Sequence, residues 1–212
     1  MILIGMFDSP FVRRVAVSLA LLELPFEHRS WSVGRDFERI RAYNPLGRVP
    51  TLVIGETEVL MESGAILDYL DDLVGEQRAL LPARGAMRRE ALLLMALATG
   101  AADKGVAQLY EQSFRPEEKR HAPWVERCRT QMHSALGELE RRCSTRGADR
   151  WLLGSQLTQA DVTVGCVFTF LTDALGLDAR SAPYPALWSL VGRCEALPAF
   201  AGTRRPFAPP GK

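Results

Sequence analysis

A hydroxyl group that could do chemistry stands at Ser9, in the stretch FDSPFVRRV that runs from Phe7 to Val15. Pro10 is favoured at the first position of a helix, so the Ser-Pro pair predicts a serine-capped helix N-terminus. Such an end also stabilises negative charge. Ser9 could therefore be a cap that accepts from a backbone N–H, or a donor to a reactive group, and both interpretations stay open.

Two further loops could hold a ligand together with Ser9. The first is NPLGRVP at residues 44–50, and the second begins at Glu62-Ser63. Each lies where a strand is expected to meet a helix or a loop, the place where open α/β sheets bind ligands. Ser63 is expected to cap a helix whose positive end suits a carboxylate.

The first part of the chain alternates strand and helix patterns. Apolar runs predict strands, and Phe11, Val15, Leu19 and Leu22 repeat at helical spacing after Pro10. A second helix follows Ser63. The expected strands are Ile2–Met6, Phe26–Ser30, Thr51–Ile54 and Thr57–Met61, the last two joined by a turn at Gly55-Glu56. This β-α-β-β-α order predicts a small α/β domain with a mixed sheet, over residues 1–79.

Strand patterns stop at the Pro- and Gly-containing connector of residues 80–85, and a helical domain is expected over residues 86–212. The expected helices are Met87–Ser113, Glu117–Cys143, one that starts at Thr158, and Pro185–Ala196, which Pro198 would end. Thr158 and Asp161 have the spacing of a capping box, so we interpret them as a folding element and not as a catalytic pair.

Composition excludes several classes of function. The formal net charge of +1 over 212 residues argues against electrostatic capture of nucleic acid, and Arg-Arg pairs such as 13–14, 141–142 and 204–205 are interpreted as solvated surface. No signal peptide or membrane span is expected, because each apolar run is short or interrupted. The four cysteines and three histidines lack metal-ligand spacing, so we expect no metal, reduced thiols and a cytoplasmic protein.

Taken together, NPLGRVPTL, ESGAILDYL and LTQADVTVG resemble the motifs of cytosolic glutathione transferases, in the same order and over nearly the whole chain. The resemblance implies a thioredoxin-like N-terminal domain followed by an all-α helical bundle. It also implies glutathione bound at their junction, and usually a homodimer. Each motif alone would be a weaker signal than the three in series.

The resemblance also assigns roles to residues. It implies a cis Val49-Pro50 bond, with the Val49 backbone pairing to the cysteinyl backbone of glutathione as an added strand does. Glu62 and Ser63 would hold the γ-glutamyl ammonium and carboxylate. Further contacts are Arg35 and Arg48 for the glycine carboxylate, with a solvated surface as their alternative, and Asp103, which would reach a partner subunit's glutathione.

Glutathione chemistry needs a thiolate, because the neutral thiol is a poor nucleophile. The family places a Tyr, Ser or Cys hydroxyl or thiol near the end of the first strand. Phe7 has no hydroxyl, and no cysteine precedes Cys128, so Ser9 is the remaining donor. The apolar electrophile site is expected between the domains. Its expected members are Met6, Phe7, Phe11, Val106, Ala107 and Tyr110.

The resulting hypothesis is a glutathione S-transferase that conjugates the thiolate to a small apolar electrophile. Two alternatives stay open. One is a glutathione-dependent isomerase or dehalogenase, which needs the same thiolate, although FDSPFVRR lacks the serine- and cysteine-rich run of the maleylacetoacetate isomerase branch. The other is a non-catalytic protein of the same fold that binds ligands or regulates a partner.

Overall fold

A four-stranded mixed sheet forms the base of the N-terminal domain. The computed structural model describes residues 1–55, 58–147, 150–178 and 183–209. The strands are β1 (Ile2–Ile4), β2 (Glu27–Arg29), β3 (Thr51–Ile54) and β4 (Glu58–Met61), in the order β2-β1-β3-β4. β1 pairs with β2 in parallel and with β3 antiparallel, and β3 pairs antiparallel with β4. The expected mixed sheet is confirmed. The expected turn at Gly55-Glu56 includes Glu56, which lies outside the described residues.

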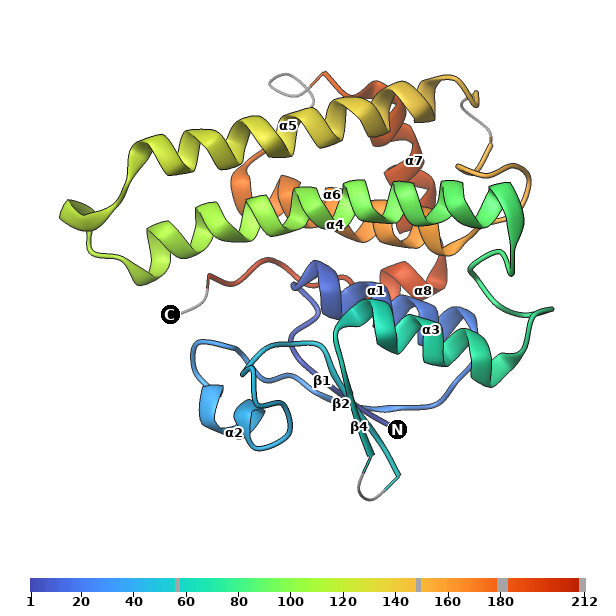
Figure 1. The fold of residues 1–212 in the computed structure, drawn as a ribbon, viewed down its shortest axis with the longest axis horizontal. Coiled ribbons are helices and arrows are strands. Elements are labelled where there is room, and N and C mark those ends of the chain that lie inside the picture. The colour runs from blue at the N-terminus through green and yellow to red at the C-terminus, as the bar shows by residue number, and fades with distance from the viewer. Residues whose placement is uncertain (56–57, 148–149, 179–182, 210–212) are drawn as a thin grey trace.

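Helices cover both faces of this sheet. α1 (Pro10–Leu21) and α3 (Ser63–Val74) lie side by side on the face toward the rest of the molecule (Figure 1). α2 (Phe37–Arg41) was not expected from the sequence. It is a short helix whose Ile40 packs with Ile4 and Val53 in a separate small cluster.

The C-terminal domain is all helical, so the fold class is the expected one: a thioredoxin-like domain followed by a helical bundle. Its elements are α4 (Gly85–Phe114), the 3-10 helix η1 (Glu117–Lys119), α5 (Ala122–Ser144), α6 (Gln159–Leu175), α7 (Pro185–Glu195) and α8 (Pro198–Thr203). The second bundle helix begins at Ala122 and not at Glu117, because Pro123 is tolerated only in a helix's first turn. For the same reason Pro198 opens α8 instead of only ending α7.

α4 is long and apolar enough, by length and composition alone, to cross a membrane, although the sequence was expected to contain no such span. It packs along α5 and α6, as Figure 1 shows for the long antiparallel pair α4 and α5. Those contacts are the ones expected of a core helix in a bundle.

α1 is buried on both sides, and this overturns the interpretation of Arg13 and Arg14 as solvated. The helix contacts α3 in its own domain and α6 and α8 in the helical domain, leaving Arg13 3% and Arg14 5% exposed. Arg13 donates two hydrogen bonds to the carboxylate of Glu195, 2.8 and 2.7 Å long, and a third to Phe200 O. The arginine is buried because its partners come from the other domain.

The capping box at the start of α6 is confirmed. The buried Asp161 carboxylate accepts from the backbone N–H of Thr158 (2.9 Å) and of Leu152 (2.7 Å), and also from the Thr158 hydroxyl (2.8 Å). One side chain therefore fixes both the N-terminus of a core helix and the loop that precedes it.

We expect Asp161→Ala to lower the free energy of unfolding by about 3 kcal/mol, because three donors lose a buried acceptor. Urea denaturation checks this. Glu126→Ala is the control, since it removes only an exposed ion pair to Arg129 and should cost less than about 1 kcal/mol. Equal losses in the two variants would contradict the structural role.

Candidate glutathione site

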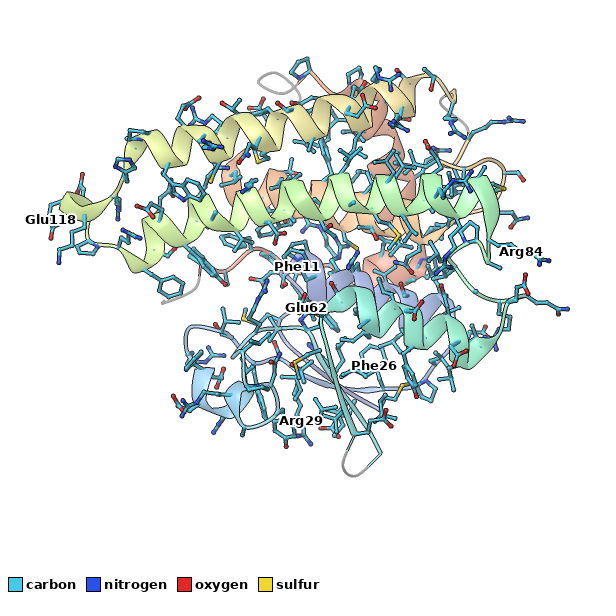
Figure 2. The ribbon with its side chains drawn as sticks, viewed as in Figure 1. Phe11, Phe26, Arg29, Glu62, Arg84 and Glu118 are labelled. Carbon is cyan, nitrogen blue, oxygen red and sulfur yellow. The ribbon has the colours of Figure 1, made fainter. Side chains whose placement is uncertain are left out.

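A cavity of about 530 Å³ opens between the two domains, beside the N-terminus of α1 and facing α4. Figure 2 places Phe11 and Glu62 near this junction. Eight of the predicted site residues line the cavity, five from the N-terminal domain and three from the helical domain. They are Met6, Ser9, Phe11, Arg48, Val49 and, from α4, the group Asp103, Val106 and Tyr110. Residues that were predicted to bind glutathione and residues that were predicted to bind the electrophile thus line the same cavity.

Ser9 is the N-cap of α1 and also lines this cavity. Its Oγ accepts from the N–H of Val12 at 3.4 Å, longer than the usual 2.9–3.0 Å for such a bond. Within the described residues the hydroxyl donates to no protein acceptor. The two interpretations of Ser9 are therefore compatible, because the oxygen lone pair serves the cap while the proton stays available to a ligand.

The loop before β3 is organised by one buried amide. Asn44 Nδ2 donates to Arg48 O (2.9 Å) and to Thr51 Oγ1 (3.1 Å), and Asn44 Oδ1 accepts from Leu46 N–H (3.0 Å). The Val49-Pro50 bond is cis, as the resemblance implied. Within the described residues the Val49 N–H and C=O form no hydrogen bond, which leaves both free for a ligand.

Gly5 allows this loop to approach the Ser9 turn closely. It has φ +131°, and a Cβ at this position would lie 2.5 Å from Val12 Cγ2 and 2.8 Å from Val49 Cβ. Any larger residue would push α1 away from the loop. The lack of a side chain at Gly5 therefore allows the Val49 loop to lie close to the start of α1, where Ser9 is.

Glu62 stands at the end of β4 with φ 68°, a backbone conformation uncommon for a residue other than glycine. α3 begins at Ser63 itself, so the expected N-cap is one residue off: Glu62 occupies that position without a side-chain cap bond. The Glu62 carboxylate lies 3.4 Å from Arg48. Backbone strain of this kind concentrates at functional sites.

Arg14 is a residue of this region that sequence reasoning missed. Its Nη2 donates to the buried Ser63 Oγ over 2.7 Å, and burial lowers the pKa of the guanidinium to about 10. Its Nε has no partner among the described residues. At neutral pH Arg14 therefore keeps its positive charge, which lies next to Ser63 at the N-terminus of α3. Only the tertiary contact, and no sequence pattern, identifies this role.

Across the cavity, Asp103 and Tyr110 face the loop from α4. Burial raises the pKa of Asp103, and the negative charge of Glu62 raises it further. The positive charge of Arg48 partly offsets this shift. Burial likewise raises the pKa of the Tyr110 phenol, so its hydroxyl stays protonated at neutral pH. Tyr110 can therefore donate a hydrogen bond to a molecule in the cavity.

Six predicted residues do not line the cavity. The ring of Phe7 stacks on His28 with centroids 3.7 Å apart, which turns it into the core. Ala107 is on α4 but falls outside the lining face, and Arg35 is exposed and pairs with Asp36 at 3.3 Å. Pro50, Glu62 and Ser63 also lie beside the cavity and not among its lining residues.

Several lining residues had no sequence signal. Among them are five aromatic residues from distant segments: Trp31 before α2, Phe37 at the start of α2, Phe114 at the end of α4, Phe170 on α6, and Phe207 after α8. Helical spacing marks such residues as apolar but does not say which cavity they meet.

The described residues contain no group of three or more His, Cys, Asp and Glu side chains that could hold a metal ion. All four cysteines are free and buried, and burial raises the pKa of Cys143 to about 11 and of Cys166 to about 12. None of them lines the cavity. A nucleophilic thiol at this site must come from a ligand.

Comparison with known proteins agrees with this geometry. The sequence model for the glutathione S-transferase N-terminal domain matches residues 3–78, and that for the C-terminal domain matches residues 122–193. The chain belongs to the glutathione S-transferase family. A crystal structure of a glutathione S-transferase from Methylobacterium radiotolerans, in complex with glutathione sulfonate, superposes with a TM-score of 0.88 at 32% identity, covering 98% of this chain and 95% of that one.

Two curated relatives match over nearly their full length. The GST-like protein YibF of Escherichia coli K12 is 27% identical, covering 97% of this chain and 99% of the relative. A probable maleylacetoacetate isomerase of Vibrio cholerae is 28% identical, covering 95% and 94%. Transferase-like and isomerase relatives are thus about equally similar to this chain, so identity alone does not choose between them.

We expect Ser63→Ala to destabilise the fold by about 1–3 kcal/mol, because Arg14 Nη2 loses its buried acceptor. Chemical denaturation measures this without any ligand. Ser144→Ala is the matched control: that exposed hydroxyl donates to Arg141 O on α5, and its loss should cost at most about 0.5 kcal/mol. A Ser63→Ala loss no larger than the control's would show that Arg14 does not depend on this hydroxyl.

Proposed function

We propose that this protein is a glutathione transferase that activates the thiol of bound glutathione and joins it to a small apolar electrophile. One observation carries the proposal: the Ser9 hydroxyl at the α1 N-terminus lines the same cavity as Val49, whose backbone N–H and C=O form no hydrogen bond within the described part of the chain. The family relationship supports glutathione as the co-substrate, since the M. radiotolerans relative holds a glutathione derivative.

The proposed glutathione site uses charges already arranged around the cavity. The Val49 N–H and C=O would pair with the cysteinyl backbone. Ser63, backed by the Arg14 cation and the α3 N-terminus, would hold the γ-glutamyl carboxylate, while Glu62 would accept from the ammonium. Arg48 would contact the glycine carboxylate if it leaves its ion pair with Glu62, and Asp103 would complete the ammonium site of a partner's glutathione. Arg35 is exposed and paired with Asp36, so its contact requires the ligand to displace that acid.

The chemistry follows from stabilising the thiolate. The glutathione S–H loses its proton to solvent, and the Ser9 O–H and the α1 N-terminus stabilise the sulfur anion. The sulfur lone pair then attacks an electrophilic carbon. In a substitution the C–S bond forms as the leaving group departs with its bonding pair, and in an addition a proton completes the product. Met6, Phe11, Val106 and Tyr110 would contact the electrophile.

The isomerase and dehalogenase alternatives need the same thiolate. The similarity to the probable maleylacetoacetate isomerase of Vibrio cholerae supports keeping the isomerase as an alternative. A non-catalytic binding role would use the same cavity without turnover. Steady-state assays with glutathione and a panel of aryl halides, epoxides, haloalkanes and cis-enones separate the three. Turnover with none of them, together with tight glutathione binding, would favour the binding role over the transferase.

We expect Ser9→Ala to lower kcat about 10- to 100-fold while the Kd for glutathione changes less than about threefold, because only the thiolate loses a donor. Ser9→Gly tests the same role with less cost to helix capping. Stopped-flow absorbance of the thiolate and calorimetry provide the two readouts.

The control for this pair is Ser30→Ala, an exposed serine after β2 that lies outside the cavity. It should leave kcat and the thiolate absorbance unchanged. If Ser9→Gly retains the wild-type kcat, Ser9 is only a cap, and backbone N–H groups must stabilise the sulfur.

A cytoplasmic homodimer completes the proposal. Leu73 on α3 and Met87, Leu92 and Leu93 on α4 are 42–53% exposed, which gives apolar surface for a second copy. We expect light scattering to give twice the 23.5 kDa chain mass. A monomer at micromolar concentration would contradict the dimer. Free, buried cysteines agree with a reducing compartment, which fractionation of cells would check.

A further inference from the structure

The turn between β1 and α1, residues 5–9, carries the Ser9 hydroxyl, and β2 holds this turn in place. Met6 and Ser9 of the turn line the cavity. Two backbone hydrogen bonds shape it: Ser9 N–H donates to Met6 O (3.1 Å), and Gly5 N–H donates to Arg29 O on β2 (2.9 Å). β2 lies beside β1 in the sheet that α1 covers (Figure 1). The neighbouring strand therefore anchors the start of the turn.

His28 on β2 makes two further contacts with this turn. Its Nε2 lies 2.8 Å from Gly5 O. Because a carbonyl oxygen only accepts, Nε2 is the ring nitrogen that carries a proton and donates. The His28 ring also stacks on the Phe7 ring, with centroids 3.7 Å apart and an angle of 10° between the planes. One side chain thus holds the turn at two points, one on each side of Met6.

The register of the sheet explains why His28 reaches the turn. His28 pairs with Leu3 in the parallel β1–β2 ladder, so the two side chains point to the same face of the sheet. Leu3 and Phe7 are both buried in the main hydrophobic core, which places the His28 ring on the core side of an edge strand. Among the described residues the His28 side chain forms no other hydrogen bond and no ion pair. Its polar contact therefore serves the turn alone.

The packing around Gly5 links the position of the turn to the helix cap. A Cβ at Gly5 would lie 2.5 Å from Val12 Cγ2 and 2.8 Å from Val49 Cβ, so a shift of this residue presses on α1 and on the Val49 loop. Ser9 Oγ accepts from Val12 N–H at 3.4 Å, which is already near the limit for a hydrogen bond. A small displacement of the turn is therefore enough to redirect the Ser9 hydroxyl.

The C-terminal segment, residues 204–209, contacts the same turn from the helical domain. Ala208 N–H donates to the Asp8 carboxylate (2.9 Å), and the Arg205 guanidinium lies 5.9 Å from the centre of the Phe7 ring. Both contacts are with side chains of the turn. Among the described residues outside the turn, His28 is the one whose side chain is hydrogen-bonded to the turn's backbone. It therefore has the most direct hold on the chain path that leads into Ser9.

We infer that His28 is a positioning residue for the proposed reaction: through Gly5 and Phe7 it holds the Ser9 hydroxyl in line with the sulfur of bound glutathione. The inference rests on the proposed function, since Ser9 is the group that would stabilise the thiolate. His28 is not among the residues that line the cavity, so it acts through the turn and touches no ligand. A hydrogen bond weakens steeply as its length and angle depart from the optimum, so the position of the turn decides how well the thiolate is stabilised.

The test measures the thiolate directly. The ultraviolet absorbance of bound glutathione is titrated against pH for the wild-type chain and for His28→Phe, which keeps an aromatic ring beside Phe7 but removes the donor to Gly5 O. At the pH where half of the wild-type-bound glutathione is ionised, we expect the thiolate absorbance to fall about two- to fivefold in the variant. Calorimetry with S-methylglutathione, which has no thiol to ionise, should give a Kd that changes less than about twofold, because the groups that hold the peptide are unchanged.

A double-mutant cycle with Ser9→Ala shows whether His28 acts through the serine. At the midpoint of the Ser9→Ala titration, we expect His28→Phe to lower the absorbance by less than about 1.5-fold. An equal fall in both backgrounds would mean that His28 acts by another route and would overturn the inference. His28→Gln restores an N–H donor near the place of Nε2, and we expect it to recover more than about half of the wild-type absorbance. A glutamine variant as impaired as the phenylalanine variant would contradict the role of the hydrogen bond to Gly5.

Phe7→Leu is a second variant for the case in which His28→Phe does not fold. It removes the stacked ring and leaves the bond to Gly5 O, and we expect a fall in absorbance that again disappears in the Ser9→Ala background. An unchanged absorbance in folded Phe7→Leu and folded His28→Gln, with an unfolded His28→Phe, would assign His28 to folding alone and overturn the inference. The thermal midpoint of each variant reports folding.

His133→Phe is the matched control. His133 Nδ1 forms a 2.9 Å hydrogen bond with Tyr184 Oη in the helical domain, and neither residue lines the cavity. The variant should lower the thermal midpoint and keep the wild-type thiolate absorbance. Equal losses of absorbance in His133→Phe and His28→Phe would show that general destabilisation is responsible, and the inference would be wrong.

Three results separate this inference from the proposed function. If the wild-type chain binds no glutathione, or binds it without ionising the thiol, both proposals are wrong. If the thiolate survives Ser9→Ala unchanged, the role of Ser9 and the role of His28 are wrong together, while glutathione binding stands. If Ser9→Ala loses the thiolate and His28→Phe keeps it, only the role of His28 is wrong.

Discussion

The burial of α1 on both faces is the constraint on which the rest of the structure depends. One side of the helix packs with the sheet and α3, and the other packs with α6 and α8. Two arginines in sequence then find acceptors in the helical domain, Arg13 at Glu195 and Arg14 at Thr163. Arg14 also donates to Ser63 of its own domain. Because an unpaired buried cation is costly, the two domains can dock in few ways other than this one.

This docking also creates the cavity. The N-terminus of α1, with Ser9, emerges at the edge of the domain interface, where α4 and the C-terminal segment provide the opposite wall. The N-terminal domain lines the cavity with Ser9 and Val49 and also with larger side chains, among them Phe11, Trp31 and Phe37. The helical domain and the C-terminal segment line it with four aromatic residues, Tyr110, Phe114, Phe170 and Phe207, and with aliphatic residues and Asp103. Both domains thus contribute to the lining of one cavity, and in the proposed reaction glutathione and the electrophile would meet there.

A strained backbone and polar groups without protein partners occur together at this edge of the sheet, among the described residues. Glu62 has a left-handed backbone, Val49 has no backbone partner among the described residues, and Ser9 accepts a long cap bond while its proton stays unused. Each feature would be unfavourable in an ordinary loop. Their clustering within one site is what is expected where a ligand supplies the missing partners.

The sequence by itself determined the fold class, the order of strands and helices along the chain, the three loops and the caps at Ser9 and Thr158, because these follow from local periodicity, turn residues and capping spacing. Only the tertiary structure decided that Arg13 and Arg14 are buried, that Phe7 turns to His28, and that the chain end reaches Asp8. These contacts join residues up to 200 positions apart, and no local pattern encodes which distant partner a charge or a ring will meet. The residues that line the cavity are decided by how the two domains dock, whereas the start of a helix is decided by residues adjacent in sequence.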